Sequence, residues 1–136
     1  MVTATAIPAG YEQYDSRNNF VEYIGPLYFR DGAEGPQFGF LVEPRHCNML
    51  DIAHGGLLSA FADIAITRAV AECTELRALT LSLTTDFIGA AKRGAWVESR
   101  VSISKRGGGI GFATCEILAD GVVVVHASAA MKYIPR

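Results

Sequence analysis

The chain has 136 residues, of which 50% are hydrophobic and 19% charged, with a formal net charge of −2. This length predicts one domain over residues 1–136, and the low charged fraction excludes intrinsic disorder for most of it. No run of like charges exceeds two residues, so the clustered basic face of a nucleic-acid-binding protein is missing. A low charge count also indicates that another subunit covers part of the surface.

The three cysteines, Cys47, Cys73 and Cys115, are odd in number and form no CxxC pair. Neither a disulfide framework nor a zinc-binding knuckle is therefore expected, and unpaired thiols are typical of the reducing cytoplasm. The sequence begins without the basic and apolar regions of a signal peptide, and no apolar run approaches the ~20 residues that cross a membrane. These features predict a cytoplasmic protein with no membrane segment, no metal and no other cofactor.

Secondary structure is predicted from apolar periodicity and from the glycines and prolines that interrupt it. Residues 1–20 are expected to form an irregular arm with a short helix over 11–19. A short strand at Leu27–Arg30 and a second strand at Gln37–Val42 follow. After a loop, the stretch Gly55–Glu72 is rich in alanine and leucine and apolar on most faces, which predicts a nearly buried helix.

Four strand-like segments occupy the rest of the chain: Leu79–Ile88, Ala95–Lys105, Gly109–Ala119 and Val122–Tyr133. Asp120-Gly121 between two apolar runs is a strong hairpin signal, and Gly107-Gly108 marks a second turn. Long antiparallel strands beside one buried helix predict an α+β domain whose sheet packs around that helix.

The start of the predicted helix favours the binding of an oxyanion. His54-Gly55-Gly56 leads into a helix N-terminus, where unpaired backbone N–H groups carry a partial positive charge. Glycine at this point lets a carbonyl oxygen approach those groups closely. The alternative is a glycine-rich turn without chemistry.

A polar stripe runs along the same helix. Ser59, Asp63 and Thr67 are spaced at i, i+4 and i+8 among apolar residues, so they share one face. Such a stripe needs a hydrogen-bonding partner or a pocket. The alternative is a structural ion pair of Asp63 with Arg68, with Arg77 or with a group of a partner subunit.

The spacing of Gly56 and Asp63 constrains how both could act. Seven residues are two helical turns, roughly 10 Å along the axis, so one reacting carbonyl cannot contact both at ~3 Å. If both act on one substrate, they must come from different subunits. Two antiparallel helices related by a two-fold axis would place the N-terminus of one beside the middle of the other.

The pattern Asn48-x5-His54-Gly55-Gly56-x6-Asp63, followed by strands and a Lys/Arg-Gly-Gly loop, resembles the hotdog-fold acyl-CoA thioesterases of the phenylacetate-pathway (PaaI-like) branch. The resemblance covers residues 37–134. It implies a long antiparallel sheet wrapped around one central helix, and a homodimer that joins two sheets edge to edge and often pairs again into a homotetramer. It also implies hydrolysis of an acyl-CoA thioester.

The resemblance assigns a role to each catalytic candidate. The backbone N–H of Gly56 would stabilise the oxyanion, and His54 and Asn48 would orient the thioester carbonyl or the attacking water. Asp63 would act as general base or as nucleophile. Thr80 lies near a family Ser/Thr position that helps to hold the water.

The remaining substrate contacts are expected at the helix start, on its polar face and at three basic residues that suit CoA phosphates: Gly55, Ser59, Thr67, Arg93, Lys105 and Arg106. One position departs from the family pattern, because Asp51 stands where the family often has glycine. This difference puts the geometry of Asn48 in question.

Other candidate sites carry less weight. The spacing of His46 and Cys47 to His54 matches no common metal-ligand set, His126 is expected to be a structural strand histidine, and no GxSxG motif surrounds Ser59. Three functions stay open: a thioesterase for small, medium or aryl-acyl groups, a non-catalytic acyl-CoA-binding protein, and a hydratase or dehydratase acting on β-hydroxyacyl thioesters. A pure binder has no use for Asp63 in a wet site.

Overall fold

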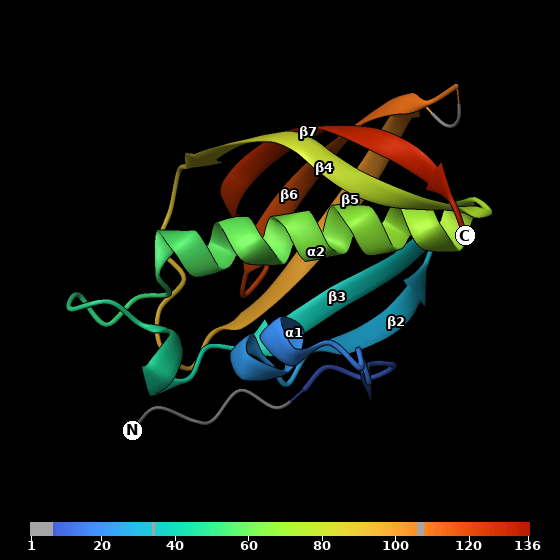
Figure 1. Cartoon of the computed structure of the whole chain (residues 1–136). Helices are drawn as coiled ribbons and strands as arrows, with labels where there is room; N and C mark the ends of the chain where they lie inside the picture. Colours follow the sequence, from blue (N-terminus) through green and yellow to red (C-terminus); the bar gives the residue numbers. More distant parts are fainter. Residues whose placement is uncertain (1–6, 34, 106–107) are drawn as a thin grey trace.

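A seven-stranded antiparallel sheet wraps around one long helix in the computed structural model, which describes residues 7–33, 35–105 and 108–136 (Figure 1). The strand order is β1-β2-β3-β5-β6-β7-β4. The strands are β1 (Glu12–Gln13), β2 (Tyr28–Gly32), β3 (Gly35–Leu41), β4 (Leu76–Phe87), β5 (Trp96–Lys105), β6 (Ile110–Ala119) and β7 (Val122–Pro135). The helices are α1 (Asn19–Ile24) and α2 (Gly55–Cys73), with a 3-10 helix at Pro44–His46. The predicted α+β architecture is confirmed.

Helix α2 is buried on most of its faces, as the sequence predicts. Nine of its residues are buried, among them Phe61, Ile66 and Val70, and the helix packs against β3 to β7. It ends where the Thr74 hydroxyl and the Thr74 N–H both donate to the carbonyl of Val70. In the described part of the chain, no helix is long and apolar enough to cross a membrane.

The helix predicted over residues 11–19 is wrong. Glu12–Gln13 form the short strand β1, which pairs with β2. The cause is a contact far along the chain: the Tyr11 hydroxyl donates to Glu98 (2.8 Å), and the Tyr11 ring packs edge-on against Trp96. These contacts hold the arm extended across the sheet, and a helix over the same residues would lose them.

Helix α1 begins later than predicted. Asn18 caps it, because its side-chain oxygen accepts hydrogen bonds from the N–H groups of Phe20 and Val21. Asparagine is a preferred residue at this position. Val21 is the only residue of α1 that is buried, so α1 lies on the surface of the domain.

The long strands confirm the predicted hairpin at Asp120-Gly121. Both residues have positive φ, 46° and 83°, as a type I′ turn requires. Strand β4 begins at Leu76, three residues before the predicted start, and lies at an edge of the sheet. No strand of the described chain pairs with its outer edge, and the large apolar side chains of Leu79, Leu81 and Phe87 are exposed there.

Gly39 provides a test of packing in the sheet. A Cβ atom at this position in β3 would lie 2.2 Å from the Trp96 ring, whose indole is buried. We expect Gly39→Ala to lower the free energy of unfolding by about 1–3 kcal/mol, because the ring must move in a packed core. Urea unfolding would measure this effect. Ser102→Ala on the exposed face of β5 is the control, and equal midpoints for the two variants would contradict the prediction.

Candidate active site

The N-terminus of α2 is capped by its own histidine. His54 Nδ1 accepts the Gly56 N–H at 2.9 Å, and the His54 N–H donates to the carbonyl of His46. The Gly56 N–H, which is the donor expected to stabilise the oxyanion, is therefore already hydrogen-bonded to the imidazole. Gly55 is held against Phe87, whose ring would lie 3.2 Å from a Cβ atom at this position. A side chain at residue 55 would thus require the Phe87 ring to shift by a few tenths of an ångström.

The polar stripe of α2 faces the edge strand β4. The Thr80 hydroxyl donates to Asp63 Oδ1, and the hydroxyls of Ser59 and Thr85 lie 3.1 Å apart. Thr67 differs, because its hydroxyl donates to the carbonyl of Asp63 in its own helix (2.9 Å). The stripe therefore supplies one oriented carboxylate and one hydroxyl pair between α2 and β4.

The within-chain ion pairs weighed for Asp63 do not form. In the part of the chain that the structure describes, neither Arg68 nor Arg77 lies within ion-pair distance of this carboxylate, although both line the same cavity. Asp63 instead takes a hydrogen bond from Thr80, the hydroxyl predicted to hold the water. Thr80 thus orients Asp63 directly and leaves its second carboxylate oxygen available.

Asn48 lies apart from these residues. Its side-chain oxygen accepts the N–H of Leu50 at 2.9 Å, which closes a tight turn within its own loop. Asp51 completes that turn with a φ of 60°, a left-handed conformation that glycine adopts most easily and aspartate tolerates. The position at which the family often has glycine is thus one that requires a positive φ. The sequence predicted a contact of Asn48 with the reacting group, and the structure shows a local turn.

Arg93, predicted to contact phosphate, pairs with Asp51 at 3.2 Å, and its N–H donates to the Asp51 carbonyl. Both side chains are more than half exposed, so this ion pair is weak. Lys105 is the last residue of β5, a central strand that β6 and β7 separate from β4. Arg106 falls outside the described residues.

Gly56 and Asp63 line different cavities in one protomer. His54, Gly56 and Leu57 line a cavity of about 470 Å³ together with Phe20 and Tyr23 of α1. Asp63 and Thr67 line a second cavity of about 390 Å³. This separation agrees with the prediction that one carbonyl cannot reach both within a chain. The sequence did not predict that α1 lines this cavity. The one sequence signal for α1 is Asn18, which caps the helix.

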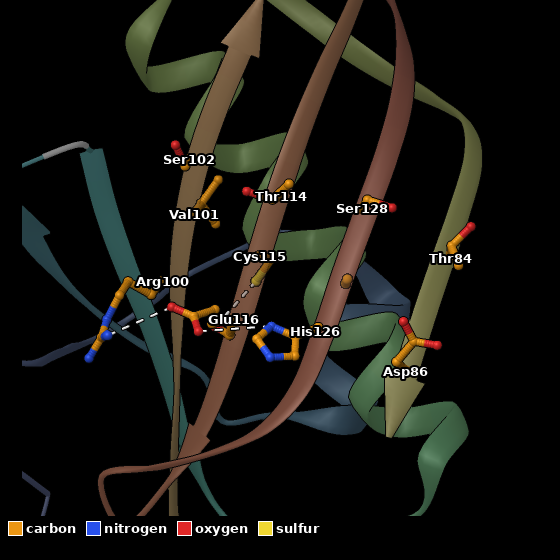
Figure 2. A pocket seen from close by; sticks show the side chains of 11 residues that line it. Thr84, Asp86, Arg100, Val101, Ser102, Thr114, Cys115, Glu116, His126 and Ser128 are labelled. Carbon is orange, nitrogen blue, oxygen red and sulfur yellow. Dashed lines mark hydrogen bonds and ion pairs between the residues drawn. The ribbon is translucent and has the colours of Figure 1, made fainter. Parts of the chain in front are cut away.

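A further cavity, about 520 Å³, is lined by none of these residues (Figure 2). It is a depression on the exposed face of β4 to β7, on the opposite side of the sheet from α2. Glu116 forms an ion pair there with Arg100 (3.8 Å), and its carboxylate lies 3.9 Å from Nδ1 of His126. No predicted site residue lines it. Among the described residues, no group of three or more His, Cys, Asp or Glu side chains could hold a metal.

His46 connects α1 to the start of the site. Its Nδ1 accepts the Glu43 N–H (3.0 Å), so Nε2 carries the proton and donates to the Ile24 carbonyl (2.7 Å). The ring is buried, and this burial lowers the pKa of His46. The two hydrogen bonds fit a neutral imidazole, so His46 has a structural role.

The lowered pKa predicts a pH-dependent stability. Below about pH 6.5 the histidine of the unfolded chain becomes protonated, whereas the buried ring of the folded chain stays neutral to a lower pH. The unfolded chain then binds more protons, so the free energy of unfolding falls as the pH drops through this range. His46→Gln, which keeps an acceptor and a donor without titrating, should reduce the fall. Denaturant unfolding between pH 7.5 and 5.5 would measure it, and equal slopes for both proteins would contradict the assignment.

Comparisons with known proteins agree with this fold. A family model described as the thioesterase superfamily matches residues 50–126. A Pseudomonas aeruginosa protein named as an unconfirmed esterase is 30% identical over 125 residues, which cover 90% of this chain and 93% of that protein. A single-residue variant of the phenylacetic acid degradation protein PaaI of Thermus thermophilus superposes with a TM-score of 0.75 and 24% identity, over 85% of this chain and 98% of that one.

A hypothetical thioesterase of Streptococcus pneumoniae, solved with coenzyme A, superposes with a TM-score of 0.76 and 17% identity, over 87% of this chain and 97% of that one. The sheet wrapped around α2 therefore has the hotdog fold, and the PaaI protein shares this fold. The chain belongs to the thioesterase superfamily, and this membership indicates hydrolysis of thioesters in general.

Proposed function

We propose that the protein hydrolyses an acyl-CoA thioester to a free acid and CoA, with a small, medium or aryl-acyl group as the acyl part. The observation that carries the proposal is the Asp63 carboxylate on α2, oriented by the Thr80 hydroxyl and open to a cavity. A carboxylate with one free oxygen in such a place suits proton transfer from water. The homologue solved with coenzyme A supports CoA as the thiol.

The reaction follows from these groups. Asp63 removes a proton from a water molecule, and the water oxygen attacks the thioester carbon. The carbonyl oxygen becomes an oxyanion, which the helix N-terminus at Gly56 stabilises with a backbone N–H. The oxyanion then collapses and the C–S bond breaks, and the leaving thiolate takes up the proton that Asp63 holds, which returns Asp63 to its carboxylate form. To accept this hydrogen bond, the oxyanion displaces the His54 imidazole from the Gly56 N–H. Between turnovers, the imidazole holds the N–H group in place.

A homodimer joined at β4 completes the site in this proposal. Strand β4 has an open edge with exposed leucines, and the polar stripe of α2 faces that same edge. A partner that pairs its own β4 there adds its α2 beside the first, with Gly56 of one subunit near Asp63 of the other. Two such dimers would form the tetramer that is the alternative assembly.

The proposed location is the cytoplasm. Its support is chemical: among the described residues no cysteine takes part in a disulfide, as expected in a reducing compartment. Burial raises the pKa of Cys115 to about 12, so this thiol stays protonated.

Thiol release from a panel of acyl-CoA thioesters tests the proposal. Turnover of any of them supports hydrolysis, and the substrate with the highest kcat/KM names the acyl class. Binding of acyl-CoA without thiol release would favour a carrier or sensor. Hydration of a crotonyl thioester without thiol release would favour a hydratase.

Arg93 allows a test of the phosphate contact. We expect Arg93→Gln to raise KM for the CoA thioester about tenfold, the scale of one charge-assisted hydrogen bond, with kcat little changed. The corresponding pantetheine thioester carries no phosphate and should show equal KM for both proteins. An equal rise in KM for both substrates would mean that Arg93 stabilises the Asp51 turn and does not bind phosphate.

A further inference from the structure

The cavity that contains Asp63 is lined by two arginines from different elements. Arg68 comes from α2 and Arg77 from the beginning of β4, and Asn18 and Thr67 add polar groups to the same wall. The mechanism proposed above uses Asp63 in this cavity and leaves both guanidinium groups without a role. Two positive charges beside one carboxylate give the lining a net positive charge.

The two arginines differ in their partners: among the described residues Arg77 has no ion pair, and Arg68 has a weak one with Glu72. Arg68 lies 4.0 Å from Glu72, at the limit of an ion pair, and both side chains are substantially exposed. Its guanidinium also lies 5.9 Å from the Tyr14 ring. Arg77 forms no ion pair with any residue in the described ranges, and it is exposed. Arg77 is therefore available to an anion, and Arg68 can bind one by giving up its weak contact with Glu72.

The rest of the lining is apolar. It consists of Phe20 and Val21 of α1, Ala60, Ile64 and Ala71 of α2, and Ala78 of β4. A hydrocarbon chain fits between such walls, and an anionic group at its end fits the arginines. The planar fork of an arginine binds a carboxylate through two parallel hydrogen bonds.

We propose that Arg68 and Arg77 form a carboxylate-binding subsite, which selects acyl thioesters whose acyl chain ends in a carboxylate. The proposal rests on the proposed function, because that function places the thioester at Asp63. Arg68 follows Asp63 by five residues on α2, and both residues line this cavity. The axial rise between them is about 7.5 Å and the rotation about 140°, so the long arginine side chain must reach around the helix to the end of a short acyl chain. The phosphates of CoA are a second source of anions, but the long pantetheine arm separates them from the thioester. The acyl end is therefore the source that we favour.

Two substrates of equal chain length test the subsite: hexanoyl-CoA, which ends in a methyl group, and adipoyl-CoA, which ends in a carboxylate. We expect wild-type protein to have at least tenfold higher kcat/KM for adipoyl-CoA. Arg77→Gln and Arg68→Gln should each reduce the adipoyl-to-hexanoyl ratio at least fivefold. Arg100→Gln, on the opposite face of the sheet (Figure 2), is the matched control and should leave the ratio as it is.

The same two acyl groups on pantetheine separate the two sources of anion. If the arginine variants lose the adipoyl preference with pantetheine thioesters as well, the acyl carboxylate is the ligand. If they lose activity equally with both CoA substrates and with neither pantetheine substrate, the arginines bind phosphate and the proposal is overturned. Hydrolysis of hexanoyl-CoA without any adipoyl preference also overturns it, and it leaves the proposed function standing.

Thioether analogues of both CoA substrates test the subsite without turnover. By calorimetry, wild-type protein should bind the carboxyl-terminated analogue at least tenfold more tightly than the methyl-terminated one, and Arg77→Gln should bind both alike. Equal binding by wild-type protein overturns the subsite even if no thioester is hydrolysed. Binding selectivity without thiol release would keep the subsite and remove the proposed function.

Discussion

Asp63→Asn should lower kcat for the best acyl-CoA substrate by at least 10²-fold, with little change in KM. The amide keeps the size of the side chain and still accepts a hydrogen bond from Thr80, but it cannot take a proton from water. The loss therefore measures the chemical role of the carboxylate, since the shape of the cavity is retained. Steady-state thiol release, together with a thermal unfolding curve for each protein, is the measurement.

Two further variants show that this loss is specific. Glu116→Gln makes the same chemical change on the opposite face of the sheet, where Glu116 pairs with Arg100 and lies near His126 (Figure 2), and kcat should stay within twofold of wild type. Thr80→Val removes the hydroxyl that orients Asp63, and we expect a loss of about tenfold, since positioning contributes less than the proton transfer itself. Retention of most activity by Asp63→Asn would remove Asp63 from the mechanism.

The parts of the fold that could be predicted are those determined by local pattern. The apolar faces of Gly55–Cys73 indicate a buried helix wherever the rest of the chain lies, and Asp120-Gly121 forms the same turn in many hairpins. The arm could not be predicted in this way. Tyr11 is held extended by Glu98, a residue 87 positions later in the chain, so no local window contains the cause.

In the candidate site, too, the part determined by local pattern could be predicted and the part determined by side-chain direction could not. The stripe of Ser59 and Asp63 is a helical periodicity, and its need for partners is met by β4 through Thr85 and Thr80. The role of Asn48 depends on the direction of a side chain within a loop. The amide of Asn48 satisfies its own turn, which a spacing motif cannot show.

Charged contacts were the least predictable part. Arg93 was expected, from the family resemblance, to contact a CoA phosphate, and the structure adds a carboxylate within 3.2 Å of it, that of the left-handed Asp51. Arg68 and Arg77 were considered as partners for Asp63, and they share its cavity without pairing with it. A sequence identifies the charges, whereas their distances depend on how α2 and β4 meet.

Mixed dimers would show whether Gly56 and Asp63 of different subunits form one site. Gly56→Pro deletes the N–H donor in the first turn of α2, where proline is tolerated, and should cost 10²–10³ in kcat. Asp63→Asn removes the base. A heterodimer of the two variants has one site that carries both lesions and one site that carries none. Purified through two different affinity tags, it should recover about half of the wild-type activity per dimer.

The reciprocal heterodimer supplies the control. Wild-type protein paired with the double variant Gly56→Pro/Asp63→Asn has one lesion in each site, if the sites form between subunits, so it should be nearly inactive. Sites formed within one chain would reverse both results: the double-variant heterodimer would keep half of the activity, and the heterodimer of single variants would have none. The two heterodimers contain the same substitutions in equal number, so a difference in activity between them reports only how the residues are shared. Within one protomer, Gly56 and Asp63 line separate cavities, and we therefore expect activity in the heterodimer of single variants.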